Sequence, residues 1–307
     1  MAPSTNAVAD AAPSSVLLGR PRPQPRKVVG RLGPWQLLRA IGDGATSRVY
    51  LARPAGADDA VGSYAVKSLR REWWSDRRAI ESQRRESMVG ARVNSPHVAP
   101  ILAAGVSAPP YYTVSPWLAG RTAAAMLADG ARPPLPVALW IARQAAQGLE
   151  ALWRQAGMIH GDVKPANLMV GPDGHTTLID LGFCSSPSDA PCWADRPVIG
   201  TLRYLAPERA TSATRIDPRS DLYSLGATLY ELIAGRPPHD GDTPAALLAQ
   251  HRCERPECLR SAAPGTPKAV ASLVHRLLAK DPLRRPASHA EVVDELARLE
   301  IACFAMR

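Results

Sequence analysis

The chain changes character near Ala119–Gly120, and this change constrains its fold more than any other feature. Before that point, short apolar runs alternate with glycine-containing turns, a pattern that predicts strands. After it, apolar residues recur three and four positions apart over long stretches, which predicts helices with one buried face. A chain of 307 residues is long enough for two lobes with separate cores. We therefore predict an α+β fold, with a small sheet-rich lobe followed by a larger, mainly helical lobe.

The first lobe is predicted to contain a small antiparallel sheet and one helix. The expected strands are Trp35–Ile41, Val49–Arg53, Tyr64–Leu69, about Val98–Gly105 and about Tyr111–Trp117. A charged segment from about Asp76 to Val93 predicts the helix, because Asn94-Ser95-Pro96 stops it. The turn between the first two strands is rich in glycine, as expected of a hairpin.

The second lobe is predicted from helical periodicity. Residues 137–155 carry a buried face formed by Leu139, Ala142, Ala146, Leu149 and Leu152. Further helices are expected at 218–234, 243–251, 266–279 and 288–302. Residues 1–30, rich in Ala, Pro, Ser and Arg, are expected to be a disordered tail. We place the folded domain at 31–302, its lobes at about 35–118 and 119–302, and a short tail at 303–307.

Composition excludes several classes of function. The formal net charge of +9 is partly carried by four basic residues before residue 28, and no nucleic-acid motif accompanies it. No segment approaches the roughly 18 consecutive apolar residues of a membrane span. The five cysteines lack the C-x-x-C spacing of zinc sites. With no secretory signal at the N-terminus, we expect a soluble, cytoplasmic protein with reduced thiols.

Three features of the first lobe suit a bound nucleotide. Gly42-Asp43-Gly44-Ala45-Thr46-Ser47 lies between two predicted strands, where a flexible turn can fold over a triphosphate. Lys67 lies on the third strand and Glu86 in the helix that follows. Each signal is weak by itself, but a Lys–Glu ion pair would hold the lysine against the α- and β-phosphates.

In the second lobe, a polar run, H-G-D-V-K-P-A-N, follows the first predicted helix, from His160 to Asn167. Its proline forbids a continuing helix, so the run is predicted to be a loop. Asp162 is placed to orient a substrate hydroxyl, Lys164 to neutralise a transferring phosphate and Asn167 to bind a metal ion. Asp180 follows an apolar strand and precedes a short turn, where its carboxylate can reach Mg²⁺.

Three later motifs complete an ordered set. They read G-T-L-R-Y-L-A-P-E at Gly200–Glu208, S-D-L-Y-S-L-G at Ser220–Gly226 and L-A-K-D-P-L-R-R-P at Leu278–Pro286. With the earlier motifs, they make residues 35–300 resemble the Hanks-type (eukaryotic-like) serine/threonine protein kinases of bacteria. This resemblance implies the bilobal protein-kinase fold. It also implies transfer of the γ-phosphate of ATP to Ser or Thr of protein substrates, autophosphorylation, and Mg²⁺ or Mn²⁺ as cofactor.

The resemblance also assigns roles to single residues. Asp162, Lys164, Lys67 and Glu86 would be the catalytic residues, and Asn167 and Asp180 the metal ligands. Adenine would meet the Pro116 carbonyl and the Leu118 amide at the hinge beside the gatekeeper Ser115, with Ile41, Val49, Ala65 and Met169 around the ring. The docking loop would hold Thr201 near Asp162 and Lys164, Asp221 would brace the catalytic loop, and Arg285 would pair with Glu208.

Three positions depart from the family's pattern. Ser47 replaces the third glycine of the phosphate loop, and Leu181 replaces the usual phenylalanine after Asp180. Gly161 precedes the catalytic Asp162, where most members of the family carry an arginine that pairs with a phosphate on the activation loop. Without that arginine, we expect basal activity without a phosphorylated loop, here about residues 183–199, whose Ser185, Ser186 and Ser188 are candidate acceptors.

Two rival functions are weighed against this prediction. Kinases of small molecules such as aminoglycosides or choline also carry His-Gly-Asp, but they typically lack the docking loop and commonly have histidine where Lys164 stands. A pseudokinase scaffold would lack the lysine, the catalytic aspartate or the metal-binding aspartate, and all three are present. We expect no nucleic-acid partner and no membrane span. The protein substrate, the oligomeric state, the activating signal and a redox role of Cys184 and Cys192 are left open by the sequence.

Overall fold

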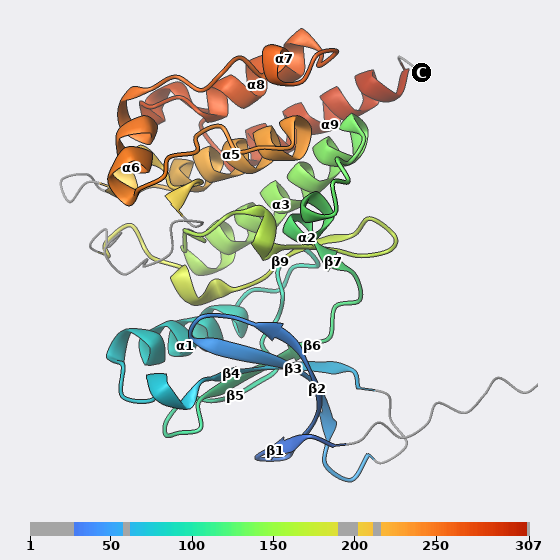
Figure 1. The fold of residues 1–307 in the computed structure, drawn as a ribbon, viewed down its shortest axis with the longest axis vertical. Coiled ribbons are helices and arrows are strands. Elements are labelled where there is room, and N and C mark those ends of the chain that lie inside the picture. The colour runs from blue at the N-terminus through green and yellow to red at the C-terminus, as the bar shows by residue number, and fades with distance from the viewer. Residues whose placement is uncertain (1–27, 58–61, 190–201, 211–215, 306–307) are drawn as a thin grey trace, which may run out of the picture.

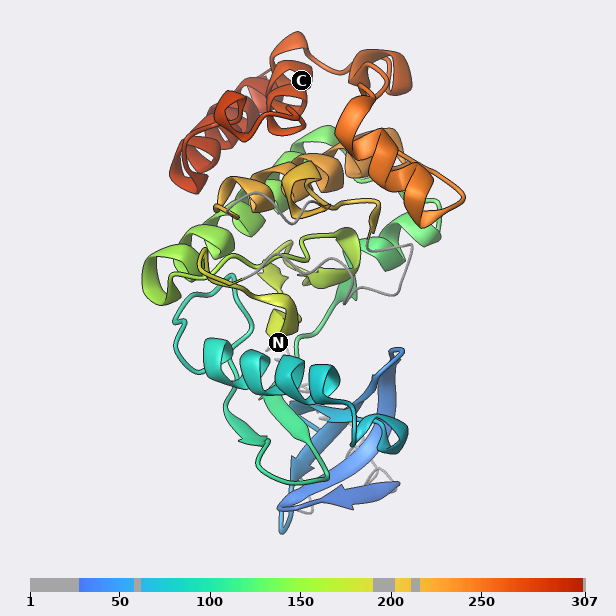
Figure 2. The ribbon, with the colours of Figure 1, turned by 90° about the vertical axis from the view of Figure 1, so that its left-hand side faces the viewer.

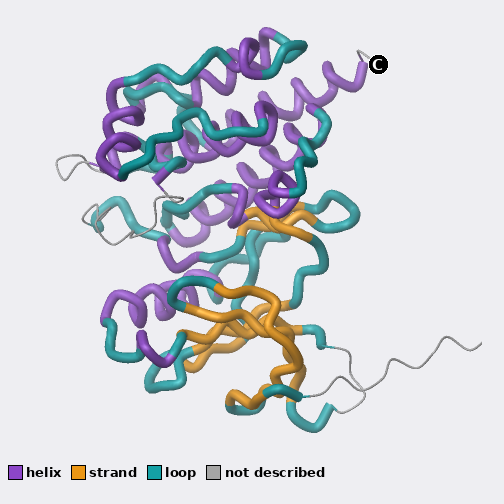
Figure 3. The backbone as a smooth tube through the Cα atoms, in the orientation of Figure 1, coloured by secondary structure: helices purple, strands orange, loops and turns teal. Residues whose placement is uncertain are grey.

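The structure is a computed structural model that describes residues 28–57, 62–189, 202–210 and 216–305. The described residues form two lobes, one built on a sheet and the other mainly helical (Figures 1 and 3). The α+β, two-lobed fold predicted from the sequence is confirmed. Thr201, predicted to lie in the docking loop, and Cys192, a candidate for a redox role, lie outside the described residues.

The small lobe is built on a six-stranded sheet in which every neighbouring pair is antiparallel, in the order β1-β2-β3-β4-β6-β5. Its strands are β1 (Gly30–Leu32), β2 (Trp35–Asp43), β3 (Ser47–Pro54), β4 (Tyr64–Leu69), β5 (Ala103–Gly105) and β6 (Tyr112–Pro116). Leu37, Ala52, Val66 and Val114 form one buried core on this sheet. The five predicted strands are present, although β5 covers only the end of the predicted 98–105. The short β1 was not predicted.

Helix α1 (Arg77–Gly90) accompanies this sheet and faces the helical lobe (Figure 2). It begins where the Asp76 carboxylate accepts a hydrogen bond from the Ala79 amide at 2.8 Å, satisfying one of the unpaired donors of the first turn. One face is buried, and it carries Gln83, Glu86 and Val89 at spacings of three. The helix therefore presents Glu86 inward rather than to solvent.

The large lobe is a bundle centred on α3 and α5 (Figure 1). Its helices are α2 (Ala123–Ala128), α3 (Leu135–Ala156), α5 (Arg219–Ala234), α6 (Pro244–Cys253), α7 (Leu259–Ala262), α8 (Lys268–Leu277) and α9 (His289–Ala305). Helix α3 packs against α5 and α9, and α5 packs against α8. The five predicted helices of this lobe are present, and α9 continues three residues past its predicted end. The short α2 and α7 were not predicted.

A second sheet connects the two lobes. It holds β7 (Arg121–Thr122), β8 (Leu168–Val170) and β9 (Thr176–Leu178) in that order, all antiparallel. The loop after α1 joins it, because Leu178 accepts a hydrogen bond from Ala99 and donates one to His97, each at 2.9 Å. Strands of two or three residues are too short to show an alternating pattern, so the sequence did not predict this sheet.

Within the described ranges, none of the helices combines the length and the apolar character that a membrane-spanning segment requires.

Candidate active site

Three charged side chains meet where the lobes face each other. Lys67 on β4 places its Nζ atom 2.8 Å from Oδ1 of Asp180 and 3.0 Å from Oε2 of Glu86. Glu86 comes from α1, whereas Asp180 follows β9 in the large lobe. The lysine therefore joins the sheet, the helix and the large lobe at one point, and we call Lys67, Glu86 and Asp180 the lobe-spanning cluster.

The pKa values of this cluster differ with the partners of each group. Burial would lower the pKa of Lys67, but the Asp180 and Glu86 carboxylates outweigh it and raise that pKa above its usual range. Burial would raise the pKa of Asp180, yet the Lys67 charge lowers it to about 2. For Glu86, burial prevails over the attraction of Lys67, and the nearby Asp180 charge adds to it, so its pKa is raised. Asp180 is thus held ionised, the form that a metal ion requires.

Two neutral residues of α1 fix the helix against this cluster. Gln83 donates from Nε2 to the Lys67 carbonyl at 3.1 Å and to Oγ1 of Thr113 at 3.3 Å. Ser82 donates from Oγ to the Gly182 carbonyl at 3.2 Å. Neither residue was predicted from the sequence. A signal for Gln83 exists, because it lies three positions before Glu86 and thus on the same helix face.

Ion pairs and hydrogen bonds hold the glycine-rich turn between β2 and β3 in place. Gly44 donates its amide to the Ser47 carbonyl at 2.9 Å, which closes the turn. Arg48 donates to both carboxylate oxygens of Asp43, at 3.0 and 3.2 Å. Arg70, at the end of β4, also pairs with Asp43 and donates from Nε to the Gly44 carbonyl at 3.0 Å. The predicted turn residues 42–47 thus remain next to the strand that carries Lys67.

The residues predicted around adenine lie on the elements that border the space between the lobes. Val49 lies directly opposite Lys67 in the sheet, so their side chains lie on the same face. Ala65 lies two residues before Lys67 on β4, and because side chains alternate along a strand it shares that face. Ile41 lies on β2 of the same sheet. The remaining predicted contacts come from the connection between lobes and from the second sheet: Pro116 at the end of β6, Leu118 just after it, and Met169 on β8.

The catalytic loop between α3 and β8 brings its three predicted residues together. Lys164 places Nζ 2.8 Å from Oδ2 of Asp162, and Asn167 donates from Nδ2 to the same oxygen at 2.9 Å. Asn167 also donates to the Asp162 carbonyl at 2.8 Å. The predicted loop ends at a short 3-10 turn, Pro165–Asn167, which was not predicted. An ammonium group and an amide are therefore both held within hydrogen-bonding distance of the Asp162 carboxylate.

A buried aspartate holds the backbone of this loop in place by hydrogen bonds. Asp221, in the first turn of α5, accepts hydrogen bonds from the amides of His160 at 2.7 Å and Gly161 at 2.8 Å. His160 is fully buried, and its Nδ1 accepts from the Asp162 amide at 3.2 Å. Asp221 thus occupies the bracing position that the resemblance predicted.

The backbone aims Asp180 toward the same region. Its φ of 66° is the one positive value among the described residues other than glycine, a conformation that costs energy and is often kept at functional sites. The side-chain nitrogen of Asn167 donates to Asp162, which leaves the side-chain oxygen Oδ1 as the atom that could bind a metal ion. Ile179 donates its amide to the Asn167 carbonyl at 3.0 Å, so the two predicted ligands are held on adjoining segments. An amide oxygen and an ionised carboxylate suit Mg²⁺.

The end of the docking loop is anchored by a buried ion pair. Arg285 donates to both oxygens of Glu208, at 2.6 and 2.8 Å, and Ser220 donates to the same carboxylate at 2.7 Å. Burial would raise the pKa of Glu208, but the hydrogen bonds and charge of Arg285 prevail and lower it. Glu208, Arg285 and Ser220 form what we call the anchor cluster.

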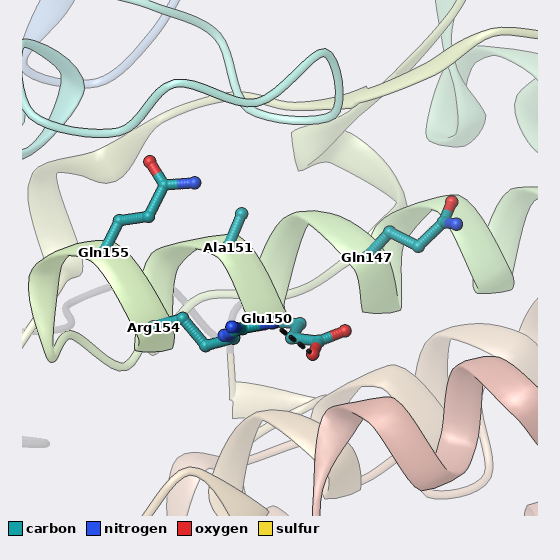
Figure 4. A pocket seen from close by; sticks show the side chains of 5 residues that line it. All are labelled: Gln147, Glu150, Ala151, Arg154 and Gln155. Atoms are coloured by element: carbon teal, nitrogen blue, oxygen red, sulfur yellow. Dashed lines mark ion pairs between the residues drawn. The ribbon is translucent and has the colours of Figure 1, made fainter.

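A hollow of about 470 Å³ lies on α3, lined by Gln147, Glu150, Ala151, Arg154 and Gln155 (Figure 4). Its side chains point to two sides of the helix, and Glu150 pairs with Arg154. None of the predicted site residues lines it.

The arrangement of a lysine–glutamate pair, a catalytic-loop aspartate and a further aspartate in these elements agrees with a family comparison. Residues 35–296 match the protein kinase domain. The chain therefore belongs to the protein kinase domain family.

Individual relatives are bacterial. The chain is 34% identical to the serine/threonine-protein kinase pkn2 of Myxococcus xanthus, over 89% of the chain and 33% of that protein. It is also 34% identical to PknB of Mycobacterium leprae, over 86% of the chain and 43% of that protein. With PrkC of Bacillus subtilis it shares 31% identity, over 82% of the chain and 38% of that protein. The chain thus spans between a third and somewhat over two-fifths of the length of these relatives.

Proposed function

We propose that this chain is a serine/threonine protein kinase that transfers the γ-phosphate of ATP to Ser and Thr hydroxyls of proteins, itself included. The observation that carries the proposal is the juxtaposition of Asp162 and Lys164, 2.8 Å apart, on the large-lobe side of the same interface that Lys67 and Asp180 bridge at 2.8 Å. Relatives named as serine/threonine-protein kinases match over most of the chain, which supports the same acceptor class.

The residues divide the reaction between them. Phosphoryl transfer depends mainly on positioning and charge neutralisation. Asp162 orients the acceptor hydroxyl and takes its proton as the bond forms, and Lys164 balances the negative charge beside it. Lys67 holds the nucleotide phosphates, with Glu86 fixing its direction. Mg²⁺, held by Asp180 and Asn167, would neutralise charge on the β- and γ-phosphates.

Several finer points belong to the same proposal. The adenine contacts, the docking role of Thr201 and the domain limits 31–302 are proposed on the resemblance and on the placement of the described residues. A cytoplasmic site of action is also proposed. Its support is that the described cysteines, Cys184, Cys253, Cys258 and Cys303, are free thiols, as expected in a reducing compartment. No nucleic acid is proposed as a partner.

We further propose that activity does not depend on a phosphate in the activation loop. Ser185 is buried, which disfavours its modification in the folded state. Ser186 lies 3.2 Å from a carboxylate oxygen of Asp189 and 2.6 Å from the Ser188 hydroxyl. A phosphate at either exposed serine would meet the Asp189 charge, so electrostatic repulsion opposes modification there.

The test is incubation of the purified chain with γ-labelled ATP, Mg²⁺ and generic casein-like or histone-like proteins. The proposal expects label on protein Ser and Thr. Label on a small alcohol such as an aminoglycoside or choline, with none on protein, would support the small-molecule kinase. Nucleotide binding without any transfer would support a pseudokinase scaffold.

A second arm tests control. Replacing Ser186 and Ser188 together by Ala is expected to leave the rate of transfer to an added protein unchanged within about twofold. Ser185 is left in place, because its hydroxyl accepts a hydrogen bond from Arg209 at 3.4 Å. Loss of turnover in this double variant would contradict phosphate-independent activity. The acceptor assay would remain valid for the kinase function itself.

A further inference from the structure

The space beside Gly161 is already occupied by another part of the chain. Gly161 has a φ of 75°, a conformation that glycine adopts without strain. A β-carbon built on it would lie 2.8 Å from Nη2 of Arg209 and 2.8 Å from the carbonyl oxygen of Phe183. Both distances are shorter than real contacts permit. The absence of a side chain at position 161 therefore leaves room for the guanidinium of Arg209.

The backbone of Arg209 lies in a turn that is held by hydrogen bonds, and its side chain extends from there to Gly161. It follows Glu208 of the anchor cluster in the 3-10 turn Pro207–Ala210, and its amide donates to the Ala206 carbonyl at 3.0 Å. The side chain is buried, with a relative exposure of 8% for the residue, although it carries a full charge. Its Nη1 donates to Oγ of Ser185 at 3.4 Å. A buried arginine held by its neighbours in this way is costly to keep unless its charge is used.

The segment that Arg209 contacts is joined to the catalytic loop. Ser185 and Ile159 exchange two backbone hydrogen bonds, each 2.9 Å long. Ile159 directly precedes His160 and Gly161, and Ser185 lies five positions after Asp180. One guanidinium therefore lies where three segments meet: the catalytic loop, the segment 183–185 that follows the metal-binding aspartate, and the turn that ends the docking loop.

We propose that Arg209 is a positioning residue that holds the segment 183–185 against the catalytic loop by its own charge, in the space left by Gly161. The inference rests on the proposed kinase function and deepens its account of control. An arginine supplied from the docking-loop turn orders the segment without a phosphate, so the active arrangement is built into the chain. The role belongs to the cation rather than to the volume of the side chain.

The discriminating pair of variants is Arg209→Met and Arg209→Lys, which have similar length but differ in charge. We expect Arg209→Met to lower kcat for protein phosphorylation at least about tenfold, with the KM for ATP changed by less than about twofold. Arg209→Lys should keep an intermediate kcat, because a lysine retains the charge but lacks the planar fork. If Arg209 merely filled space, the apolar methionine would equal or exceed the lysine variant.

A second readout does not require turnover. Hydrogen exchange at the backbone amides of Ser185 and Ile159 reports the pairing of the two segments. We expect faster exchange at both amides in Arg209→Met, and near wild-type protection in Arg209→Lys. Arg143→Met is the matched control, because Arg143 is likewise a largely buried arginine, but its partner is the Glu300 carboxylate at 2.8 Å, at the contact between α3 and α9. It should leave exchange at Ser185 and kcat unchanged.

Gly161→Ala tests the same contact should Arg209→Met fail to fold. Its β-carbon would displace the Arg209 guanidinium or the Phe183 carbonyl without removing the arginine from the chain, so kcat should fall with the KM for ATP unchanged. The inference about Arg209 would be overturned if Arg209→Met kept the wild-type kcat and hydrogen exchange, or if Gly161→Ala kept the wild-type kcat. Neither result would affect the proposed kinase function. Absence of transfer by the wild-type chain would overturn the proposed function, and this inference with it.

Discussion

The lobe-spanning cluster and the anchor cluster are both built from ion pairs of similar length, yet they differ in exposure. In the first, the side chains of Lys67 and Asp180 keep relative exposures of 23% and 32%. In the second, the corresponding values for Arg285 and Glu208 are 0% and 7%. The first cluster also joins two lobes, whereas the second lies within one. Solvent and ligands can therefore reach Lys67 and Asp180 but not Arg285 and Glu208, whereas Glu86, at 7%, is as buried as Glu208.

The hydrogen bonds of the two clusters deepen the contrast. Arg285 donates to the carbonyls of Ala279, Arg219 and Lys280 in addition to Glu208, so its guanidinium is satisfied within the protein. Lys67 has two carboxylate partners, one of which, Asp180, is the predicted metal ligand. A satisfied buried pair fixes architecture, while a partly exposed one can exchange its partner for a phosphate or a metal ion. The predictions below are ways to separate these two roles.

The largest expected effect is on stability at the anchor cluster. Arg285→Ala leaves the Glu208 carboxylate buried without its cation, and should lower the free energy of unfolding by about 3–5 kcal/mol. Denaturant unfolding measures it. Arg236→Ala, which removes an exposed pair with Glu257, is the control and should cost less than about 1 kcal/mol. Equal losses in the two variants would show that burial does not distinguish the clusters.

The next effect is on catalysis at the lobe-spanning cluster. Asp180→Asn removes the charge that a metal ion requires, and should lower kcat on the order of 10²–10³-fold. Its free energy of unfolding should change by no more than about 1 kcal/mol, because the pair is partly exposed and asparagine tolerates the positive φ of this position. Steady-state transfer and denaturant unfolding on one preparation test both halves. A loss of unfolding free energy as large as that of Arg285→Ala would show that Asp180 has an architectural role like the residues of the anchor cluster.

Asp221 lies between these extremes, since it is buried yet holds the catalytic loop. In Asp221→Asn, one of the two loop amides of His160 and Gly161 faces an NH₂ group instead of an acceptor. We expect a loss of about 1.5–3 kcal/mol of unfolding free energy together with a lowered kcat. Unchanged kcat in a destabilised variant would restrict Asp221 to an architectural role.

The smallest effect is a pH dependence within the large lobe. Burial first, and then the charge of Lys280, lower the pKa of His239 to about 4. Because this folded-state pKa lies below the ordinary 6.5, the unfolded chain binds the proton more readily, and stability falls as pH drops from 6.5 toward 4. Between pH 7 and 5, wild type should lose about 1–2 kcal/mol more than His239→Leu. Parallel pH profiles of unfolding would contradict this assignment.

Some of the site follows from sequence because its signals are local. Each predicted residue of the site lies next to a strand, a turn or a proline that fixes its local conformation, and the described structure brings these residues into two adjoining groups. They are Lys67, Asp162, Lys164, Asn167 and Asp180. The same is true of the longer strands and helices, whose periodicity spans several turns. An apolar strand before Asp180 was predicted, but β7 and β8 were missed because strands of two or three residues are too short to show an alternating pattern.

The contacts of α1 and of Arg209 were missed for a related reason. Ser82 and Gln83 look like ordinary polar residues of a charged helix, and their partners Gly182 and Thr113 lie on other elements. Arg209 follows a recognisable motif, but its significance depends on the space at Gly161, which belongs to a loop 48 residues earlier in the numbering of the chain. Only the folded arrangement reveals such a relation.

The most direct test of the central claim compares wild type with Asp162→Asn in phosphoryl transfer at saturating Mg²⁺ and ATP. The account predicts labelled Ser and Thr on protein with the wild type, and a loss on the order of 10²–10⁴-fold in the variant, with an unchanged Kd for the nucleotide. Equal transfer by the two proteins, or nucleotide binding by both without any transfer, would contradict it.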